Sequence, residues 1–219
     1  MEDLEISEMK VVPCTESKFI KLSRVVFKQN GCERKWDYVK SHDSVVVLLL
    51  NTTRNSFILV KQFRPAVYMH INRKLHTPSH GELDKEKEDA GLAITAPFWQ
   101  GITFELCAGI VDQNISLKTL TRQEIFEECG YDVPEDRIQR ITSCRSGVGI
   151  SGTLQTMFYA EVSDTMQVGS GGGNPHEGER IELYYLPVDQ ARDFLFDESK
   201  PKPSGLLFAF MWWLDKNRK

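Results

Sequence analysis

The 219-residue sequence lacks the features that mark secreted, membrane-spanning and zinc-binding proteins. Its five cysteines are odd in number and scattered, with no CxxC pair, which argues against both a disulfide framework and a structural zinc site. No apolar run approaches the roughly 18 residues that a membrane span needs, and the acidic N-terminus lacks the apolar core of a secretory signal. We therefore expect a reducing, cytoplasmic location and no membrane partner.

An excess of charge of one sign is also missing. The 27 Lys and Arg residues nearly balance the 31 Asp and Glu residues, and the formal net charge is −4. Nucleic acids and anionic membranes favour clustered basic side chains, so no nucleic-acid partner is expected. A polyanionic substrate would need local cations or a metal ion. Hydrophobic residues make up 41% of the chain, which excludes the composition of a disordered protein.

The first half of the chain predicts strands. Residues 19–29 and 32–40 flank Asn30-Gly31, a dipeptide that tolerates positive φ and favours a tight hairpin. Apolar, β-branched runs at 44–50 and 57–62 predict buried strands of a main sheet. The stretch 68–99 is polar and irregular, which indicates a long surface insertion, either a solvated loop or a flap near a site.

The second half alternates strands with helices and therefore predicts an α/β architecture. A glycine-rich segment, 169–173, is expected to be mobile unless something binds it. The expected strands are 102–107, 138–143, 154–162 and 180–186, and the expected helices are 117–129, 188–194 and 206–214.

Three carboxylates lie on the first of these helices. Glu124, Glu127 and Glu128 are spaced i, i+3 and i+4, so they share one helix face and repel one another. A hard divalent cation, Mg²⁺ or Mn²⁺, would compensate this charge through oxygen ligands. The alternative is an ordinary solvated helix face. Ser116 is placed to cap the helix and Gly130 to end it.

The stretch 109–131 resembles the Nudix box, which reads Gly, five residues, Glu, seven residues, then Arg-Glu-aliphatic-x-Glu-Glu-x-Gly-aliphatic. The matching residues are Gly109, Glu124, Ile125, Glu127, Glu128 and Gly130. Three positions depart from the pattern. Ile115 replaces the first Glu, Gln123 the Arg and Tyr131 the last aliphatic residue. In the family that Arg helps to hold a metal-binding Glu, so the positioning of Glu127 or Glu124 is in question.

The resemblance continues through 60–68, 104–109 and the late acidic loop, and it is strongest to the ADP-ribose and nucleotide-sugar branch of the Nudix hydrolases. It implies an α/β/α sandwich around a mixed β-sheet over residues 41–219. It also implies an N-terminal β subdomain, residues 1–40, that is exchanged or packed against a second copy in a homodimer. The expected reaction is metal-dependent hydrolysis of a nucleotide sugar, with UDP-glucose giving UMP and glucose 1-phosphate.

The resemblance also implies roles for single residues. The main-chain carbonyl of Ala108 is expected to join Glu124 and Glu128 as a metal ligand, with Glu127 assigned to catalysis. Late-loop carboxylates in this branch supply a base and a metal contact, which assigns Glu177 as general base and Glu179 as a further ligand. An acidic surface turn is the alternative for this loop.

Substrate contacts are predicted less directly. Arg64 carries a forked cation suited to phosphate, although an ion pair with a nearby carboxylate is an equal alternative. Trp36 and Phe63 could stack on a base, but aromatic residues in strands are more often core residues.

Three other functions are open on the sequence alone. An ADP-ribose pyrophosphatase would release AMP and ribose 5-phosphate. A catalytically weak Nudix-like binding module would account for Gln123 and Ile115, although the retained carboxylates argue against it. An RNA cap hydrolase would be expected to present a basic groove, which the acidic balance does not suggest.

Overall fold

The computed structural model describes residues 6–17, 19–76, 93–175 and 178–218. Its strands are β1 (Lys21–Gln29), β2 (Cys32–Lys40), β3 (Ser44–Asn51), β4 (Ser56–Phe63), β5 (Ile102–Glu105), β6 (Cys107–Ile110), β7 (Gln139–Ser146), β8 (Thr153–Val162) and β9 (Glu182–Pro187). Its helices are α1 (Pro65–His76), α2 (Leu117–Glu124), α3 (Ala191–Phe196) and α4 (Ser204–Lys216), with short turns η1 (Phe98–Gly101), η2 (Ile125–Cys129), η3 (Glu135–Arg137), η4 (Asp164–Met166) and η6 (Val188–Gln190).

Seven strands form one mixed sheet, which confirms the predicted α/β class. Strand β3 lies at its centre, parallel to β8 and antiparallel to both β4 and β6. Strand β4 also pairs with β5 and β9, and β7 pairs with β8, in each case antiparallel. The predicted strand at 102–107 is two strands in the structure, because the chain turns at Leu106 from β4 to β3.

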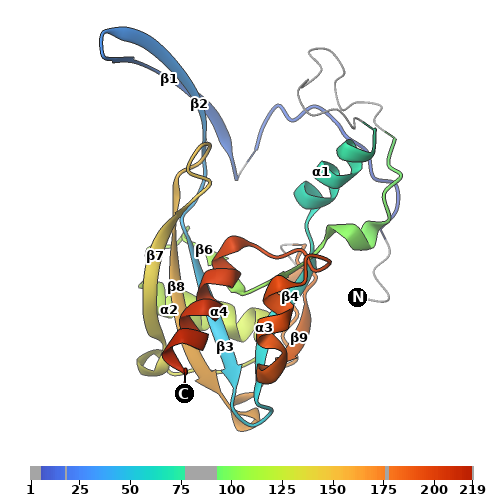
Figure 1. The fold of residues 1–219 in the computed structure, drawn as a ribbon, viewed down its shortest axis with the longest axis vertical. Helices are drawn as coiled ribbons and strands as arrows, with labels where there is room; N and C mark the ends of the chain where they lie inside the picture. Colours follow the sequence, from blue (N-terminus) through green and yellow to red (C-terminus); the bar gives the residue numbers. More distant parts are fainter. Residues whose placement is uncertain (1–5, 18, 77–92, 176–177, 219) are drawn as a thin grey trace.

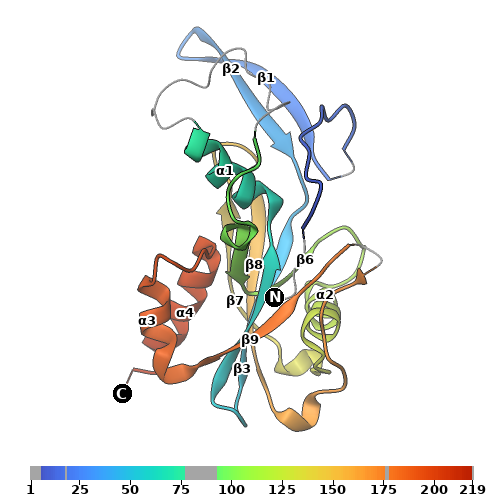
Figure 2. The same cartoon turned by 90° about the vertical axis from the view of Figure 1, so that its right-hand side faces the viewer.

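Helices cover both faces of this sheet, as Figures 1 and 2 show: α2 lies on one face, and α3 and α4 on the other. The alternation of side chains along each strand produces the two layers. Val47, Leu49 and Val60 pack toward α2, whereas Leu48, Leu59 and Phe57 pack toward α3 and α4. Fully burying a side chain of this size contributes about 1.5–3 kcal/mol. No helix of the described residues is long and apolar enough to cross a membrane.

The predicted N-terminal hairpin is confirmed. Strands β1 and β2 pair antiparallel from Lys21 opposite Lys40 to Gln29 opposite Cys32, and Asn30 and Gly31 both have positive φ, 52° and 82°. The hairpin projects away from the sandwich in Figure 1. Val39 and Trp36 tie it to the connection between β7 and β8 through hydrogen bonds to main-chain carbonyls. Whether residues 1–40 form a separate domain stays a prediction.

The prediction of an irregular insertion across 68–99 is wrong at both of its ends. Helix α1 occupies Pro65–His76 and η1 begins at Phe98; residues 77–92 lie outside the described part. Pro65 occupies the first helical position, where its missing N–H costs no hydrogen bond. Tyr68 and Asn72, one turn apart, are buried and bond the main chain of 93–96. Polar Asn72 and the surrounding charges concealed this helix in the sequence.

The helix predicted at 117–129 has the expected bounds but changes type within its length. Ser116 accepts a hydrogen bond from the Thr119 N–H as the N-cap, and Gly130 ends the helix with φ of 77°. The last turn, η2, is a π-helix rather than an α-helix. Single π turns in α-helices often mark functional sites.

Candidate catalytic site

The site is built where the chain leaves the regular sheet. Strand β5 runs along β4 and, after Leu106, β6 runs back along β3, so the two strands form a V between β3 and β4. Of the described strands, β6 pairs with β3 alone. The main-chain groups on the inner side of β6 therefore need partners from elsewhere.

Glu128 is one of these partners. Its side chain comes from η2, is only 3% exposed, and accepts a hydrogen bond of 3.0 Å at Oε2 from the Ala108 N–H. Burial raises the pKa of Glu128 to about 8, and the nearby charges of Glu124 and Glu179 add to this. Hydrogen bonds from the Ala108 N–H and the Cys107 thiol act in the opposite direction. A nearby cation would stabilise the ionised form of this buried carboxylate, so the site favours a bound cation.

The π turn explains why Glu128 and not Glu127 is buried. A π turn is wider than an α turn, so each residue after Glu124 advances by a smaller angle than the usual ~100°. Glu128 therefore comes to lie beneath Glu124, whereas Glu127 turns outward and is exposed. The three carboxylates predicted on one face thus differ in burial: Glu128 is buried, Glu124 is half-buried and Glu127 is exposed.

Gly109 allows Glu124 to approach the strand. A Cβ atom at position 109 would lie within contact distance of the carboxylate of Glu124, with its Oε1, Cδ and Cγ atoms nearest. The box glycine is therefore required by packing and not by a positive φ. Because the N–H and C=O of one residue point to the same side of a strand, the carbonyl of Ala108 faces the side from which Glu128 approaches.

The glycine-rich segment lies against this helix. The N–H groups of Gly172 and Gly173 donate to the carbonyls of Glu128 and Glu127, at 2.9 and 3.2 Å. A Cβ atom at Gly171 would collide with the main chain of Glu128. The sequence predicts that the segment is mobile unless something binds it. In the structure, the end of the helix binds it through these hydrogen bonds. Glu179 lies in the loop that follows the segment, and its Oε2 accepts a hydrogen bond of 3.0 Å from the Asn174 N–H.

Arg64 follows β4 and is held by Glu105. Its Nε and Nη2 both donate at 2.8 Å to the two oxygens of Glu105, and this pairing raises the pKa of Arg64. The charges of Glu128 and Glu179 raise the pKa of Arg64 further. Sequence reasoning missed Glu105. The sequence signal for Glu105 was a charged residue at the end of a predicted strand, two residues after Thr103.

The other predicted residues lie elsewhere. Phe63 packs in an aromatic cluster with Tyr68 and Phe98, and its pairing with Ile102 puts it on the sheet face opposite α2. Trp36 lies on the projecting hairpin, half exposed, with its indole N–H donating to the Gly149 carbonyl at 3.0 Å. Glu177 is outside the described residues.

The residues that depart from the box pattern differ in burial and in their contacts. Gln123 is exposed, and neighbouring Arg122 is paired with Asp132 at 2.8 Å, so neither takes the place of the family's Arg. Glu128 is instead held by the Ala108 N–H. Tyr131 is fully buried, and its hydroxyl is within hydrogen-bond distance of Asn51 and Tyr185.

The donor set fits a hard divalent cation. Among the described residues, no three His, Cys, Asp or Glu side chains converge closely enough to enclose an ion by themselves. Mg²⁺ does not require such an enclosure, since it is commonly bound through one or two carboxylates, waters and substrate phosphates. Glu124, the buried Glu128 and the Ala108 carbonyl offer oxygen ligands of this kind.

Two curated relatives of this chain are pyrophosphatases. The chain is 42% identical over 209 residues, 95% of its length and 94% of the relative, to uridine diphosphate glucose pyrophosphatase NUDT14 of Bos taurus. It is 29% identical over 153 residues to GDP-mannose pyrophosphatase of Salmonella typhimurium, which covers 70% of this chain and 64% of that protein. No family model matches the chain.

A solved structure shares the fold. The chain aligns with the crystal structure of an ADP compounds hydrolase with a TM-score of 0.60 and 14% identity, covering 95% of this chain and 91% of the other. The chain belongs to the Nudix hydrolase family, among its nucleotide-sugar pyrophosphatases. Enzymes of this family generally depend on a divalent metal ion.

In metal-free protein, we expect the free energy of unfolding to fall as pH rises between 4.5 and about 8 because of Glu128. Its pKa is raised in the folded state, so the folded state retains a proton that the unfolded state has released. The stabilisation is complete below this window and is lost above it. Urea denaturation in chelator across this range should give a steeper fall for the wild type than for Glu128→Gln. Equal slopes would contradict the burial of this carboxylate, and Glu127→Gln serves as the exposed control.

Replacing Gly109 with Ala should reduce pyrophosphatase activity. The added methyl group must displace the Glu124 carboxylate, and a shift of about 1 Å in a catalytic group can lower the rate by about 100-fold. We expect kcat/KM to fall by at least ~10-fold. Gly149→Ala is the matched control, since a Cβ atom there meets no heavy atom within 4 Å. Similar activity in the two variants would show that Glu124 does not depend on Gly109.

Proposed function

We propose that the chain hydrolyses the diphosphate bond of UDP-glucose, releasing UMP and glucose 1-phosphate, with Mg²⁺ or Mn²⁺ as the metal. The observation that carries this proposal is the buried carboxylate of Glu128, which lies against the strand that also presents the Ala108 carbonyl. The choice of substrate is supported by the 42% identity to a UDP-glucose pyrophosphatase.

Glu124, Glu128 and the Ala108 carbonyl are proposed to hold the metal, and Glu179, from the loop after the glycine-rich segment, to complete the ligands. When bound, the divalent cation would neutralise phosphate oxygens and lower the pKa of a bound water. The protein keeps the first two ligands fixed by packing Glu124 on Gly109 and bonding Glu128 to the main chain. Fixed charges of this kind need no reorganisation during the reaction.

Arg64 is proposed to contact the substrate's diphosphate. A guanidinium has five N–H donors, and Glu105 engages two of the donor groups of Arg64, Nε and Nη2. Glu105 thereby fixes the plane of the cation, while the side chain of Arg64 is 45% exposed. An oriented, solvent-accessible guanidinium suits bidentate recognition of phosphate.

Two roles rest on the sequence resemblance. Glu177 is proposed as the general base that accepts a proton from the attacking water, and exposed Glu127 as an auxiliary carboxylate near the metal. Trp36 is proposed to stack on the uracil base, since its ring is half exposed. Phe63 is assigned no substrate contact, because its packing partners lie on the other sheet face.

A homodimer formed through the hairpin of β1 and β2 is part of the proposal. An isolated two-stranded hairpin is marginally stable, and here both of its faces present apolar side chains to solvent. Leu22 and Val26 lie on one face, and Val25 and Phe27 on the other, with exposures from 39% to 74%. A second copy of the chain would cover this surface.

We also propose a cytoplasmic location. All five cysteines are free, and Cys14, Cys32 and Cys144 are exposed. Exposed thiols that are not paired favour a reducing compartment. The net charge of −4 supports a small anionic substrate bound through local cations and not a nucleic-acid partner.

ADP-ribose, which would give AMP and ribose 5-phosphate, is the second candidate substrate. The shared fold with an ADP compounds hydrolase favours including it in any assay. A GDP-sugar is a third, because of the likeness to GDP-mannose pyrophosphatase.

The proposal predicts UMP release from UDP-glucose in Mg²⁺ and none in chelator. Glu128→Gln should lower kcat/KM by at least ~100-fold, because it removes a carboxylate ligand of the cation that neutralises the substrate's phosphates. Asp136→Asn, an exposed carboxylate change on η3, should leave the rate unchanged. Chromatography of the nucleotide products measures both. Release of AMP or GMP alone from the matching substrates would reassign the substrate, and hydrolysis that persists in chelator would refute the metal site.

Disrupting the hairpin surface should separate the proposed dimer. Phe27→Asp places a charge on the face that carries Val25 and Trp36, whereas Lys28→Asp places it on the opposite face, one residue away. We expect the dimer dissociation constant to rise at least ~10-fold for Phe27→Asp, as for loss of a central aromatic contact. Sedimentation equilibrium gives the constant. A monomeric wild type, or no shift in Phe27→Asp, would refute this interface.

A further inference from the structure

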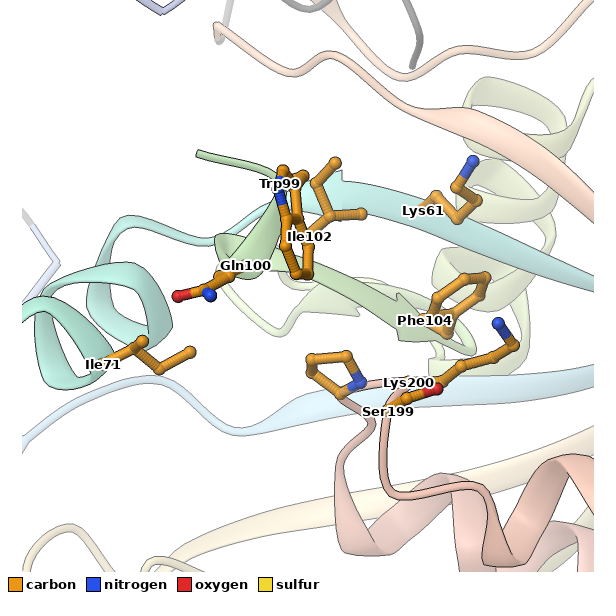
Figure 3. Close-up of a pocket in the computed structure, with 9 residues that line it drawn as sticks. Lys61, Ile71, Trp99, Gln100, Ile102, Phe104, Ser199 and Lys200 are labelled. Carbon is orange, nitrogen blue, oxygen red and sulfur yellow. The ribbon is translucent and has the colours of Figure 1, made fainter. Parts of the chain in front are cut away.

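A cavity of about 310 Å³ lies on the sheet away from the carboxylates. It opens between the ends of β4 and β5, helix α1 and the loop that connects α3 to α4 (Figure 3). Its volume is at the lower end of the range for small-molecule sites, about 300–1,000 Å³. The lining residues include Lys61, Trp99, Gln100, Ile102, Phe104 and Lys200.

The strand register puts this cavity on the face opposite the candidate catalytic site. Lys61 pairs with Phe104, which packs with the core layer of α3 and α4. The next pair, Val60 and Glu105, faces α2, since Val60 belongs to that layer and Glu105 binds Arg64. Because neighbouring residues on a strand point to opposite faces, the two sites are separated by the thickness of the sheet.

One end of the cavity carries two lysines, each of which lies beside a carboxylate. The Nζ of Lys61 lies 2.7 Å from Glu182 and 6.0 Å from the centre of the Phe104 ring. The Nζ of Lys200 lies 5.5 Å from the same ring and 3.8 Å from Asp197, and its side chain is 36% exposed. The pairing of Lys200 is loose, so its ammonium group is positioned to meet an anion that enters beside Phe104.

The other end presents an unsatisfied acceptor. The Oε1 atom of Gln100 is buried and has no hydrogen-bond partner among the described residues. A buried polar atom without a partner costs about 1–3 kcal/mol, so a ligand that donates an N–H there would recover this energy. Figure 3 shows Gln100 and Ile71 at the end of the cavity away from the two lysines.

An apolar wall connects the two ends. Trp99, Ile102 and Phe104 lie between Gln100 and the lysines in Figure 3. The Trp99 side chain is 65% exposed, an unusual state for the largest apolar side chain. Exposed aromatic rings beside cationic groups are the surfaces on which nucleobases stack, at about 1–3 kcal/mol per base.

We propose that this cavity binds a nucleoside monophosphate, at a second site separate from the catalytic one. The base stacks on Trp99 and donates an N–H to Oε1 of Gln100, and the phosphate reaches the ammonium groups of Lys61 and Lys200. A site with a cation at one end and an acceptor at the other selects a ligand that has both a phosphate and a base. The proposal does not depend on which nucleotide sugar the enzyme cleaves.

Calorimetric titration of the full chain with UMP or AMP in chelator tests this site without turnover. Inorganic phosphate and uridine are titrated separately to represent the two halves of the ligand. We expect Lys200→Gln and Gln100→Leu each to weaken binding by at least ~5-fold, in line with the loss of one charged or buried hydrogen bond. Lys28→Gln, on the hairpin, is the matched control and should bind like the wild type.

The outcomes separate this proposal from the catalytic one. Lys200→Gln should retain the wild-type rate on whichever nucleotide sugar is cleaved, because Lys200 is on the opposite face. Absence of binding up to millimolar nucleotide would overturn the second site. Equal affinity in the wild type and both cavity variants would place the nucleotide in the catalytic site instead, and equal affinity for phosphate and UMP would refute recognition of the base.

Discussion

The hydrogen bond between the main chain of Ala108 and the carboxylate of Glu128 is the contact on which the site depends. The V of β5 and β6 leaves main-chain groups facing inward, and a helix carboxylate satisfies one of them. The same contact buries a negative charge, which raises the pKa of Glu128 and favours a cation beside it. The sheet, the helix and the candidate metal site are therefore connected through one side chain.

Much of the fold could be predicted because its patterns are local. Each of these patterns predicts the structure of the residues that form it. The structure confirms the apolar strands, the turn at Asn30-Gly31, the Ser116 cap and the helix end at Gly130. Helix α1 was missed because its buried face includes polar Asn72, whose partners lie more than twenty residues away. The break at Leu106 was missed because the chain changes its pairing partner there from β4 to β3. An apolar run of residues does not indicate such a change.

The candidate site was predictable in its residue types and less so in its geometry. The spacing of Glu124, Glu127 and Glu128 indicates one shared helix face, but an α-helical reading cannot foresee the π turn that separates Glu127 from the other two. Nor does the sequence reveal that Arg64 is held by Glu105, since the ion pair joins strands forty residues apart. Long-range pairing and helix type are set by packing, which single-sequence patterns do not record.

The glycine-rich segment has a consequence for how this enzyme tolerates change. Its N–H groups bond the last carbonyls of the carboxylate helix, and its Cα atoms pack where no side chain fits. In a sequence library the segment would resemble a disposable linker, yet substitution of Gly171 would push directly on the main chain that carries Glu128. Damage to the active site can thus arise at positions with no side chain, no charge and no contact with substrate.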